Sequence, residues 1–107
     1  MADAQFLKSV ELFEGLSEPE LDLVASLMEP CVFDAGEVVF NEGEMGSVLY
    51  IILEGEVEIL KKGAGSAEGF LLGRLGKRDW FGALAFFGRS ARIDAARGAS
   101  RTEALSL

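Results

Sequence analysis

The sequence contains no histidine and a single cysteine, Cys31. Without histidine and with only one thiol, the ordinary ligand sets for zinc, copper and haem are missing, so we expect no metal site. The same lack removes serine–histidine and cysteine–histidine nucleophiles, and we expect neither enzymatic activity nor a cofactor. One cysteine also excludes an internal disulfide. This is typical of proteins in a reducing compartment, so we expect a cytoplasmic location.

Long apolar runs are absent as well. No run approaches the ~18 residues that a membrane-spanning helix needs, and the acidic start MADAQFLKSV is unlike a signal peptide, so we expect no membrane insertion. The net charge of −8 is unevenly divided: one lysine against fourteen acidic residues gives −13 in residues 1–60, and nine basic against four acidic residues give +5 in residues 61–107. An acidic domain repels nucleic acid, but its basic part can still bind one small anion.

The first 30 residues have the pattern of short helices. Apolar residues recur at helical spacing before Gly15, which is suited to end a helix. Ser17 and Glu20 then form a capping box with Pro19 in the first turn, which predicts the start of a second helix. We expect that helix to end at Pro30.

From Cys31 onward the pattern changes to short runs rich in β-branched and aromatic residues, separated by glycine-containing turns. A tight hairpin is expected at Gly55, and a single helical turn at Ala83–Phe87. The expected strands are Cys31–Phe33, Val38–Phe40, Val48–Leu53, Val57–Leu60 and Phe70–Leu72, followed by one strand-like stretch that runs to Leu107.

Strands of roughly four to six residues, spaced at roughly 8–12 residues, indicate an antiparallel roll or barrel. We therefore predict an α+β fold, an antiparallel β-roll (jelly-roll type) with N-terminal helices and one further short helix. Half of the residues are apolar, enough for a core, and residues 1–107 are predicted to form one domain. Its helices should occupy residues 1–30 and its roll residues 31–107.

A set of short motifs accompanies this order of elements. They are Leu12-Phe13, Leu16-Ser17, Ala35-Gly36, Asn41-Glu42-Gly43, Leu49-Tyr50-Ile51-Ile52 and Gly55. With these motifs, residues 10–107 resemble the cyclic nucleotide-binding domain family, which includes the catabolite activator protein and the regulatory subunits of cAMP-dependent protein kinase. The resemblance implies the same β-roll and a regulatory role.

The resemblance also places a phosphate-binding cassette at residues 81–95. The family cassette reads F-G-E-L-A, five variable residues, then P-R-A-A-T or a close variant, and Arg92 falls in register with its arginine. The resemblance implies that Arg92 pairs with the phosphate of a cyclic nucleotide, beside the start of a short helix whose N–H groups face the same anion. The implied binding residues are Gly82, Ala83, Leu84, Ala85 and Arg92, with Phe81, Arg89 and Ala91 as secondary candidates.

Four positions depart from the family pattern. Ala83 replaces the glutamate that accepts the ribose 2′-hydroxyl, and Ala91 replaces the proline. Asp94 brings a negative charge to a position where the family has a small residue. Ala95 replaces the threonine or serine that contacts the base. These changes predict weak nucleotide binding.

The leading hypothesis is a non-catalytic regulatory module for signal transduction. It would sense cAMP, cGMP or a related phosphorylated small molecule and respond by a shift of conformational populations. The alternative is a degenerate domain of the same fold that serves as an interaction or dimerisation scaffold and binds no nucleotide. Arg92 favours binding, whereas Ala83 and Asp94 favour its loss. The candidate protein partners are a second copy or an effector domain. As a loop residue, Arg92 is expected to contribute little to folding.

Overall fold

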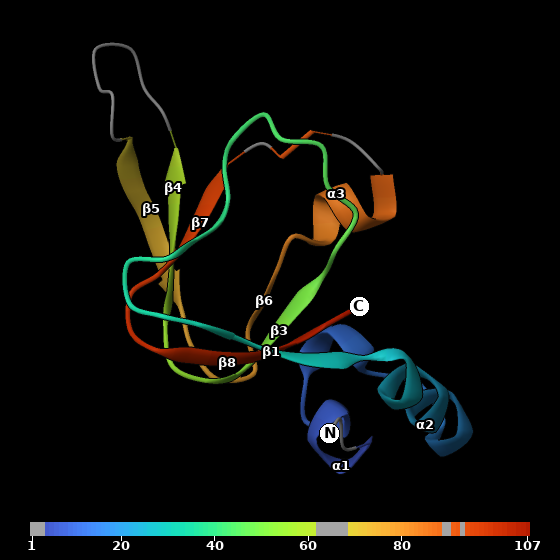
Figure 1. The fold of residues 1–107 in the computed structure, drawn as a ribbon. Coiled ribbons are helices and arrows are strands. Elements are labelled where there is room, and N and C mark those ends of the chain that lie inside the picture. Colours follow the sequence, from blue (N-terminus) through green and yellow to red (C-terminus); the bar gives the residue numbers. More distant parts are fainter. Residues whose placement is uncertain (1–3, 62–68, 89–90, 93) are drawn as a thin grey trace.

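The described residues form eight strands in two antiparallel sheets (Figure 1). The computed structural model describes residues 4–61, 69–88, 91–92 and 94–107. The strands are β1 (Glu29–Phe33), β2 (Val38–Phe40), β3 (Tyr50–Glu54), β4 (Val57–Lys61), β5 (Phe70–Leu75), β6 (Trp80–Phe81), β7 (Ala95–Gly98) and β8 (Thr102–Ser106). One sheet has the order β1-β8-β3-β6 and the other β2-β7-β4-β5. The predicted jelly-roll-type β-roll is confirmed.

Short helices flank the roll. They are α1 (Ala4–Lys8), the 3₁₀ helix η1 (Glu11–Phe13), α2 (Glu18–Leu27) and α3 (Ala83–Gly88). The predicted capping box begins α2: the Ser17 Oγ accepts from the Glu20 N–H at 3.3 Å, and the Glu20 carboxylate accepts from the Ser17 N–H at 2.8 Å. Hydrogen bonding of the Glu20 carboxylate to the Ser17 N–H, followed by that to the Ser17 side chain, lowers the pKa of Glu20.

The expected end of α2 at Pro30 is wrong, and with it the boundary between helices at 1–30 and roll at 31–107. The helix ends at Leu27, and β1 begins at Glu29 with Pro30 as its second residue. Proline is tolerated there because β1 lies at the edge of its sheet, where a missing N–H need not break a ladder of hydrogen bonds.

The sheet that contains β3 and β8 is buried on both faces. Ile51 and Leu105 point to one face and pack with apolar residues of α1, η1 and α2. Their neighbours Ile52 and Ala104 point to the other face and pack between the two sheets. Because successive side chains in a strand alternate between faces, this double burial explains the continuous apolar run Leu49–Leu53.

The stretch after the cassette forms two strands, not one. β7 lies in one sheet and pairs with β2 and β4, whereas β8 lies in the other and pairs with β1 and β3. The residues between them, 99–101, carry the chain from one sheet to the other. The loop between β2 and β3 arches across the open side of the roll toward α3 (Figure 1). This loop and α3 frame the candidate site.

Candidate functional site

The cassette begins where β6 ends. Phe81 is buried in the core between the sheets, Gly82 has a left-handed φ of 83°, and α3 starts at Ala83. A Cβ at position 82 would lie 2.7 Å from the Val48 carbonyl oxygen, so this turn requires glycine. The Gly82 carbonyl accepts the first hydrogen bond of α3, from the Phe86 N–H at 3.1 Å.

The other predicted site residues are distributed as follows. Ala83 packs against the core formed by the helices and β3, and Leu84 and Ala85 lie within α3. Ala91 is exposed and forms an isolated antiparallel bridge with Met45. Arg89 falls outside the described residues. The structure therefore brings Arg92 to Gly82, but it directs Ala83 at least partly toward the core.

Arg92 is buried, with 6% of its surface exposed. Its Nη1 donates to the Gly82 carbonyl at 3.0 Å and its Nη2 to the Val48 carbonyl at 2.9 Å. Its Nε is also buried, but has no hydrogen-bond partner in the described part of the chain. The expectation that Arg92 contributes little to folding therefore does not fit its surroundings, because a guanidinium bonded to two main-chain carbonyls joins separate segments.

The guanidinium lies between an aromatic ring and a glycine. Its Cζ is 4.1 Å from the centroid of the Phe40 ring, a cation–π distance. A Cβ built on Gly46 would lie 2.3 Å from the Arg92 Nε and 2.7 Å from its Cζ. Residue 46 must therefore lack a side chain for Arg92 to occupy this position.

The main chain of Arg92 is held by the same loop. The Arg92 N–H donates to the Glu44 carbonyl at 2.8 Å, and the Arg92 carbonyl accepts from the Gly43 N–H at 2.8 Å. The β2–β3 loop thus binds both the backbone and the side chain of Arg92. Movement of the Arg92 main chain would therefore break its hydrogen bonds to this loop.

Charge around Arg92 is mixed. Among the described residues, no carboxylate forms a salt bridge with Arg92, whereas Lys61 pairs with Glu42 at 2.7 Å. Burial raises the pKa of Asp94; the charges of Lys61 and Arg92 act in the opposite direction, and that of Glu42 in the same direction. Asp94 is thus close enough to sense both cations and weakens the positive potential at the site.

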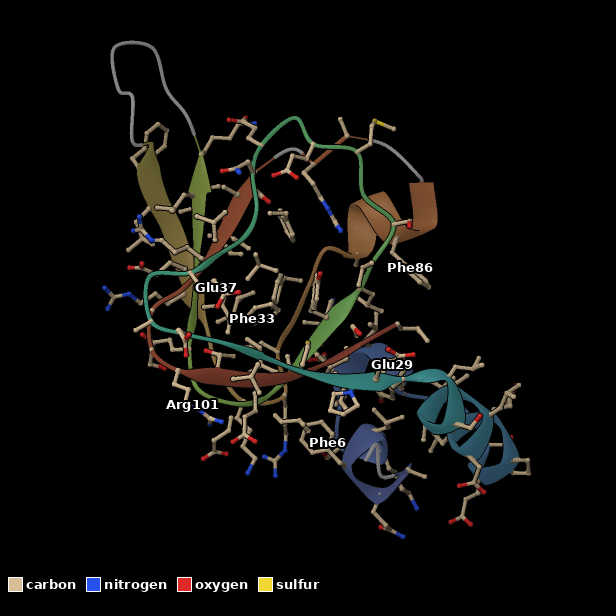
Figure 2. The ribbon with its side chains drawn as sticks, viewed as in Figure 1. Phe6, Glu29, Phe33, Glu37, Phe86 and Arg101 are labelled. Atoms are coloured by element: carbon tan, nitrogen blue, oxygen red, sulfur yellow. The ribbon has the colours of Figure 1, made fainter. Side chains whose placement is uncertain are left out.

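Aromatic rings fill the roll beneath Arg92. Tyr50 stacks on Phe81 at 4.9 Å between ring centroids and meets the edge of Phe33 at 5.6 Å. Burial raises the pKa of Tyr50, followed by the influence of Cys31, while Arg92 lowers it. Figure 2 shows Phe33 inside the roll, whereas Phe86 projects from α3 and packs against the core under the helices. The cassette helix thereby contacts the core cluster to which the N-terminal helices also contribute.

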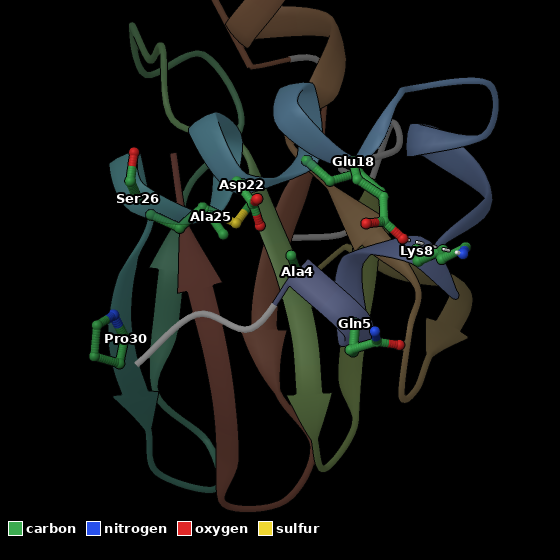
Figure 3. A pocket seen from close by; sticks show the side chains of 10 residues that line it. Ala4, Gln5, Lys8, Glu18, Asp22, Ala25, Ser26 and Pro30 are labelled. Carbon is green, nitrogen blue, oxygen red and sulfur yellow. Dashed lines mark ion pairs between the residues drawn. The ribbon is translucent and has the colours of Figure 1, made fainter.

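A larger cavity, of about 970 Å³, lies between α1, α2 and Pro30 (Figure 3). Its charged lining consists of Lys8, Glu18 and Asp22, and Lys8 already faces Glu18 at 3.9 Å. The excess of carboxylates makes this groove unsuitable for an anion. A smaller hollow, lined by Met45, Gly46, Ser47 and Phe86, lies between the β2–β3 loop and α3.

Three contributors to the Arg92 environment were not predicted: the Phe40 ring, the Gly46 backbone and the Val48 carbonyl. Only Gly46 had a visible signal, as a second glycine in the turn NEGEMG. Among the described residues there is no group of three or more histidine, cysteine, aspartate or glutamate side chains placed to hold a metal ion. None of the described helices is long and apolar enough to cross a membrane.

Comparison with known proteins places this geometry in context. Residues 30–107 match the family model of the cyclic nucleotide-binding domain. The chain is 35% identical over 99 residues to a cAMP-dependent protein kinase regulatory subunit of Mycosarcoma maydis, covering 92% of this chain and 18% of that protein.

Solved structures agree. The regulatory domain of Toxoplasma gondii PKA, co-crystallised with cAMP, matches with a TM-score of 0.91 and 28% identity, over 97% of this chain and 40% of that one. The regulatory subunit of a cAMP-independent protein kinase A from Trypanosoma cruzi, bound to guanosine, matches with a TM-score of 0.89 and 27% identity, over 97% and 37%. The chain thus spans less than half the length of these relatives. It belongs to the cyclic nucleotide-binding domain family.

Proposed function

We propose that this domain is a non-catalytic sensor that binds a cyclic nucleotide, cAMP or cGMP, or a related phosphorylated small molecule, through Arg92. The observation that supports the proposal is the buried Arg92 guanidinium, which has an unpartnered Nε and no carboxylate in a salt bridge with it in the described residues. A phosphate oxygen would supply both the missing acceptor and the missing countercharge.

The energetics favour such a ligand. A buried N–H without a partner costs about 1–3 kcal/mol, and a hydrogen bond to a charged group contributes about 1.5–3 kcal/mol. An anion that accepts a hydrogen bond from Nε would remove the cost of the unpartnered N–H and add the contribution of the charged hydrogen bond. Neutral ligands gain less because they leave the guanidinium charge uncompensated.

We expect the affinity to be modest. Ala83 carries no acceptor for a ribose hydroxyl, and its packing against the helical core leaves no polar group in its place. Asp94 places a negative charge near the anion, which opposes binding as long as it is ionised. Both features act on the ligand while leaving the Arg92 geometry intact.

The signal would pass from the cassette to the helices. Phe86 and Ala83 of α3 pack against the same core as Leu7 and Leu21 of the N-terminal helices. A ligand that repositions α3 must change this packing, and any ligand that prefers the changed packing shifts the population toward it. We propose that an effector domain or a second copy reads this shift in the cytoplasm.

Calorimetric titration with cAMP, cGMP, adenosine and guanosine tests the proposal on the wild-type protein. We expect each cyclic nucleotide to bind at least tenfold more tightly than its nucleoside, with a further dependence on salt, because Arg92 recognises charge. Equal affinity for nucleotide and nucleoside would mean that Arg92 does not contact the ligand. The titration with guanosine also tests whether this domain binds the nucleoside that is bound in the Trypanosoma cruzi relative.

A scaffold without nucleotide binding is the second candidate, and exposed apolar residues favour it. Phe70, Leu71 and Leu72 lie in the edge strand β5 with 45–54% of their surface exposed. Exposed apolar edges are typical of surfaces that associate. Light scattering across a range of concentrations, combined with an absence of heat in every titration, would support this candidate.

A further inference from the structure

Gly46 lies in the β2–β3 loop, outside the cassette, yet it touches the cassette arginine. An added Cβ would approach the Arg92 Nε to 2.3 Å and the Cζ and Nη2 to 2.7 Å. Real Cβ atoms are not found so close to other heavy atoms, so either Arg92 or the loop must move when residue 46 has a side chain. The backbone at Gly46 is not left-handed, so alanine is conformationally permitted there.

Gly46 differs in this respect from Gly82. A Cβ at Gly82 would meet the Val48 carbonyl at 2.7 Å, and the φ of 83° is unfavourable for alanine. The clash at Gly46 involves the end of a long side chain, which can rotate away. Substitution of Gly46 therefore displaces the Arg92 guanidinium without removing any atom of Arg92 and without imposing backbone strain.

We propose that Gly46 is the positioning residue for Arg92. Its missing side chain lets the guanidinium lie against Phe40 with its two terminal nitrogens held by Val48 and Gly82, which leaves Nε–H as the donor offered to an anion. The ligand part of this inference rests on the function proposed above. The positional part concerns only Gly46 and Arg92 and stands without a ligand.

Fixing the guanidinium in advance matters for affinity. A free arginine side chain loses rotational entropy when it becomes fixed, and in this protein that loss occurs on folding, before any ligand binds. In a Gly46→Ala variant the guanidinium leaves its two carbonyls. An anion must then either order the mobile Arg92 side chain on binding or bind without a hydrogen bond from it. We expect affinity for cAMP to fall at least tenfold.

A double-mutant cycle tests the positional part through thermal unfolding. Gly46→Ala should lower the Tm by roughly 5–15 °C, because the Arg92 hydrogen bonds are lost. In an Arg92→Ala background the same change should cost nothing, because nothing remains for the methyl group to displace. Gly73→Ala is the matched control: no atom lies within 4 Å of its added Cβ, so it should not lower the Tm in either background. An equal loss from Gly46→Ala in both backgrounds would mean that the loop moves instead, and would overturn the proposal.

A second measurement does not depend on stability. The Arg92 Nε–H signal in a ¹⁵N-correlated spectrum, assigned by its loss in Arg92→Lys, should be shielded by the Phe40 ring and slow to exchange with water. It should lose both properties in Gly46→Ala, and an unchanged signal refutes the proposal. Added cAMP should shift this signal in the wild type and bind at least tenfold more weakly to Gly46→Ala. If cAMP binds neither protein while the cycle and the spectrum behave as expected, the proposed ligand is wrong and the role of Gly46 stands.

Discussion

Replacement of Arg92 by alanine should destabilise the fold, although Arg92 itself lies outside the helices and strands. The change removes two hydrogen bonds from a charged donor, about 1.5–3 kcal/mol each, and the contact with Phe40, about 0.5–2 kcal/mol. The variant also removes the cost of the buried Nε–H that lacks an acceptor, which is about 1–3 kcal/mol. The middle values of these ranges give a net loss of about 4 kcal/mol, or roughly 15–30 °C in Tm for a domain of this size.

Urea unfolding and thermal melting followed by circular dichroism measure this loss. Arg101→Ala is the control, because its side chain is 63% exposed and pairs with Glu103 at 3.3 Å on the surface. Such a pair contributes at most about 1 kcal/mol. If Arg92→Ala and Arg101→Ala unfold at the same urea concentration, the two carbonyl contacts of Arg92 carry no net energy and the reasoning fails.

Three further predictions concern the cassette and its chemistry. Because burial raises the pKa of Asp94, the folded state holds its proton more tightly than the unfolded state, and stability falls as pH rises through that window. Asp94→Asn should therefore have a higher Tm than the wild type at pH 7 and the same Tm below pH 3.8, the ordinary pKa of the carboxyl group. It should also bind cAMP more tightly than the wild type. Ala83→Glu should strengthen cAMP binding about tenfold or more and create a preference over 2′-deoxy-cAMP, while lowering the Tm because Ala83 packs on the core; unchanged affinity in a folded variant contradicts this. Chromatography should detect no loss of cAMP or cGMP during incubation with the protein and magnesium, and time-dependent loss would contradict a non-catalytic role.

Local patterns in the sequence predicted local structure well. The capping box at Ser17 and Glu20 formed because its two hydrogen bonds join residues three positions apart, so the sequence contains both partners side by side. The turn at Gly55 is present, with a left-handed φ of 104°, but the predicted tight hairpin is wrong, because β3 and β4 lie in different sheets and do not pair. The end of α2 was misplaced because Pro30 can either stop a helix or lie in an edge strand, and only the sheet order distinguishes the two.

The site was predictable in part. The cassette pattern identified Arg92, and the structure brings it to Gly82. Its partners were not predictable because they are main-chain carbonyls, one of them 44 residues away at Val48, and every residue type has a carbonyl. Gly46 was equally hidden, since its role depends on how close another side chain passes. Main-chain partners of this kind become visible only when distant segments have been placed side by side.

The position of β8 has a consequence for how the protein is made. Thr102–Ser106 follows the other described strands in sequence but lies inside its sheet, between β1 and β3, and Thr102, Ala104 and Leu105 are fully buried. During synthesis each residue of β1 is therefore translated 69 to 77 residues before its partner in β8. Such long-range pairing slows folding and leaves apolar strands uncovered on the nascent chain. This sheet can be completed only after residue 106 has left the ribosome.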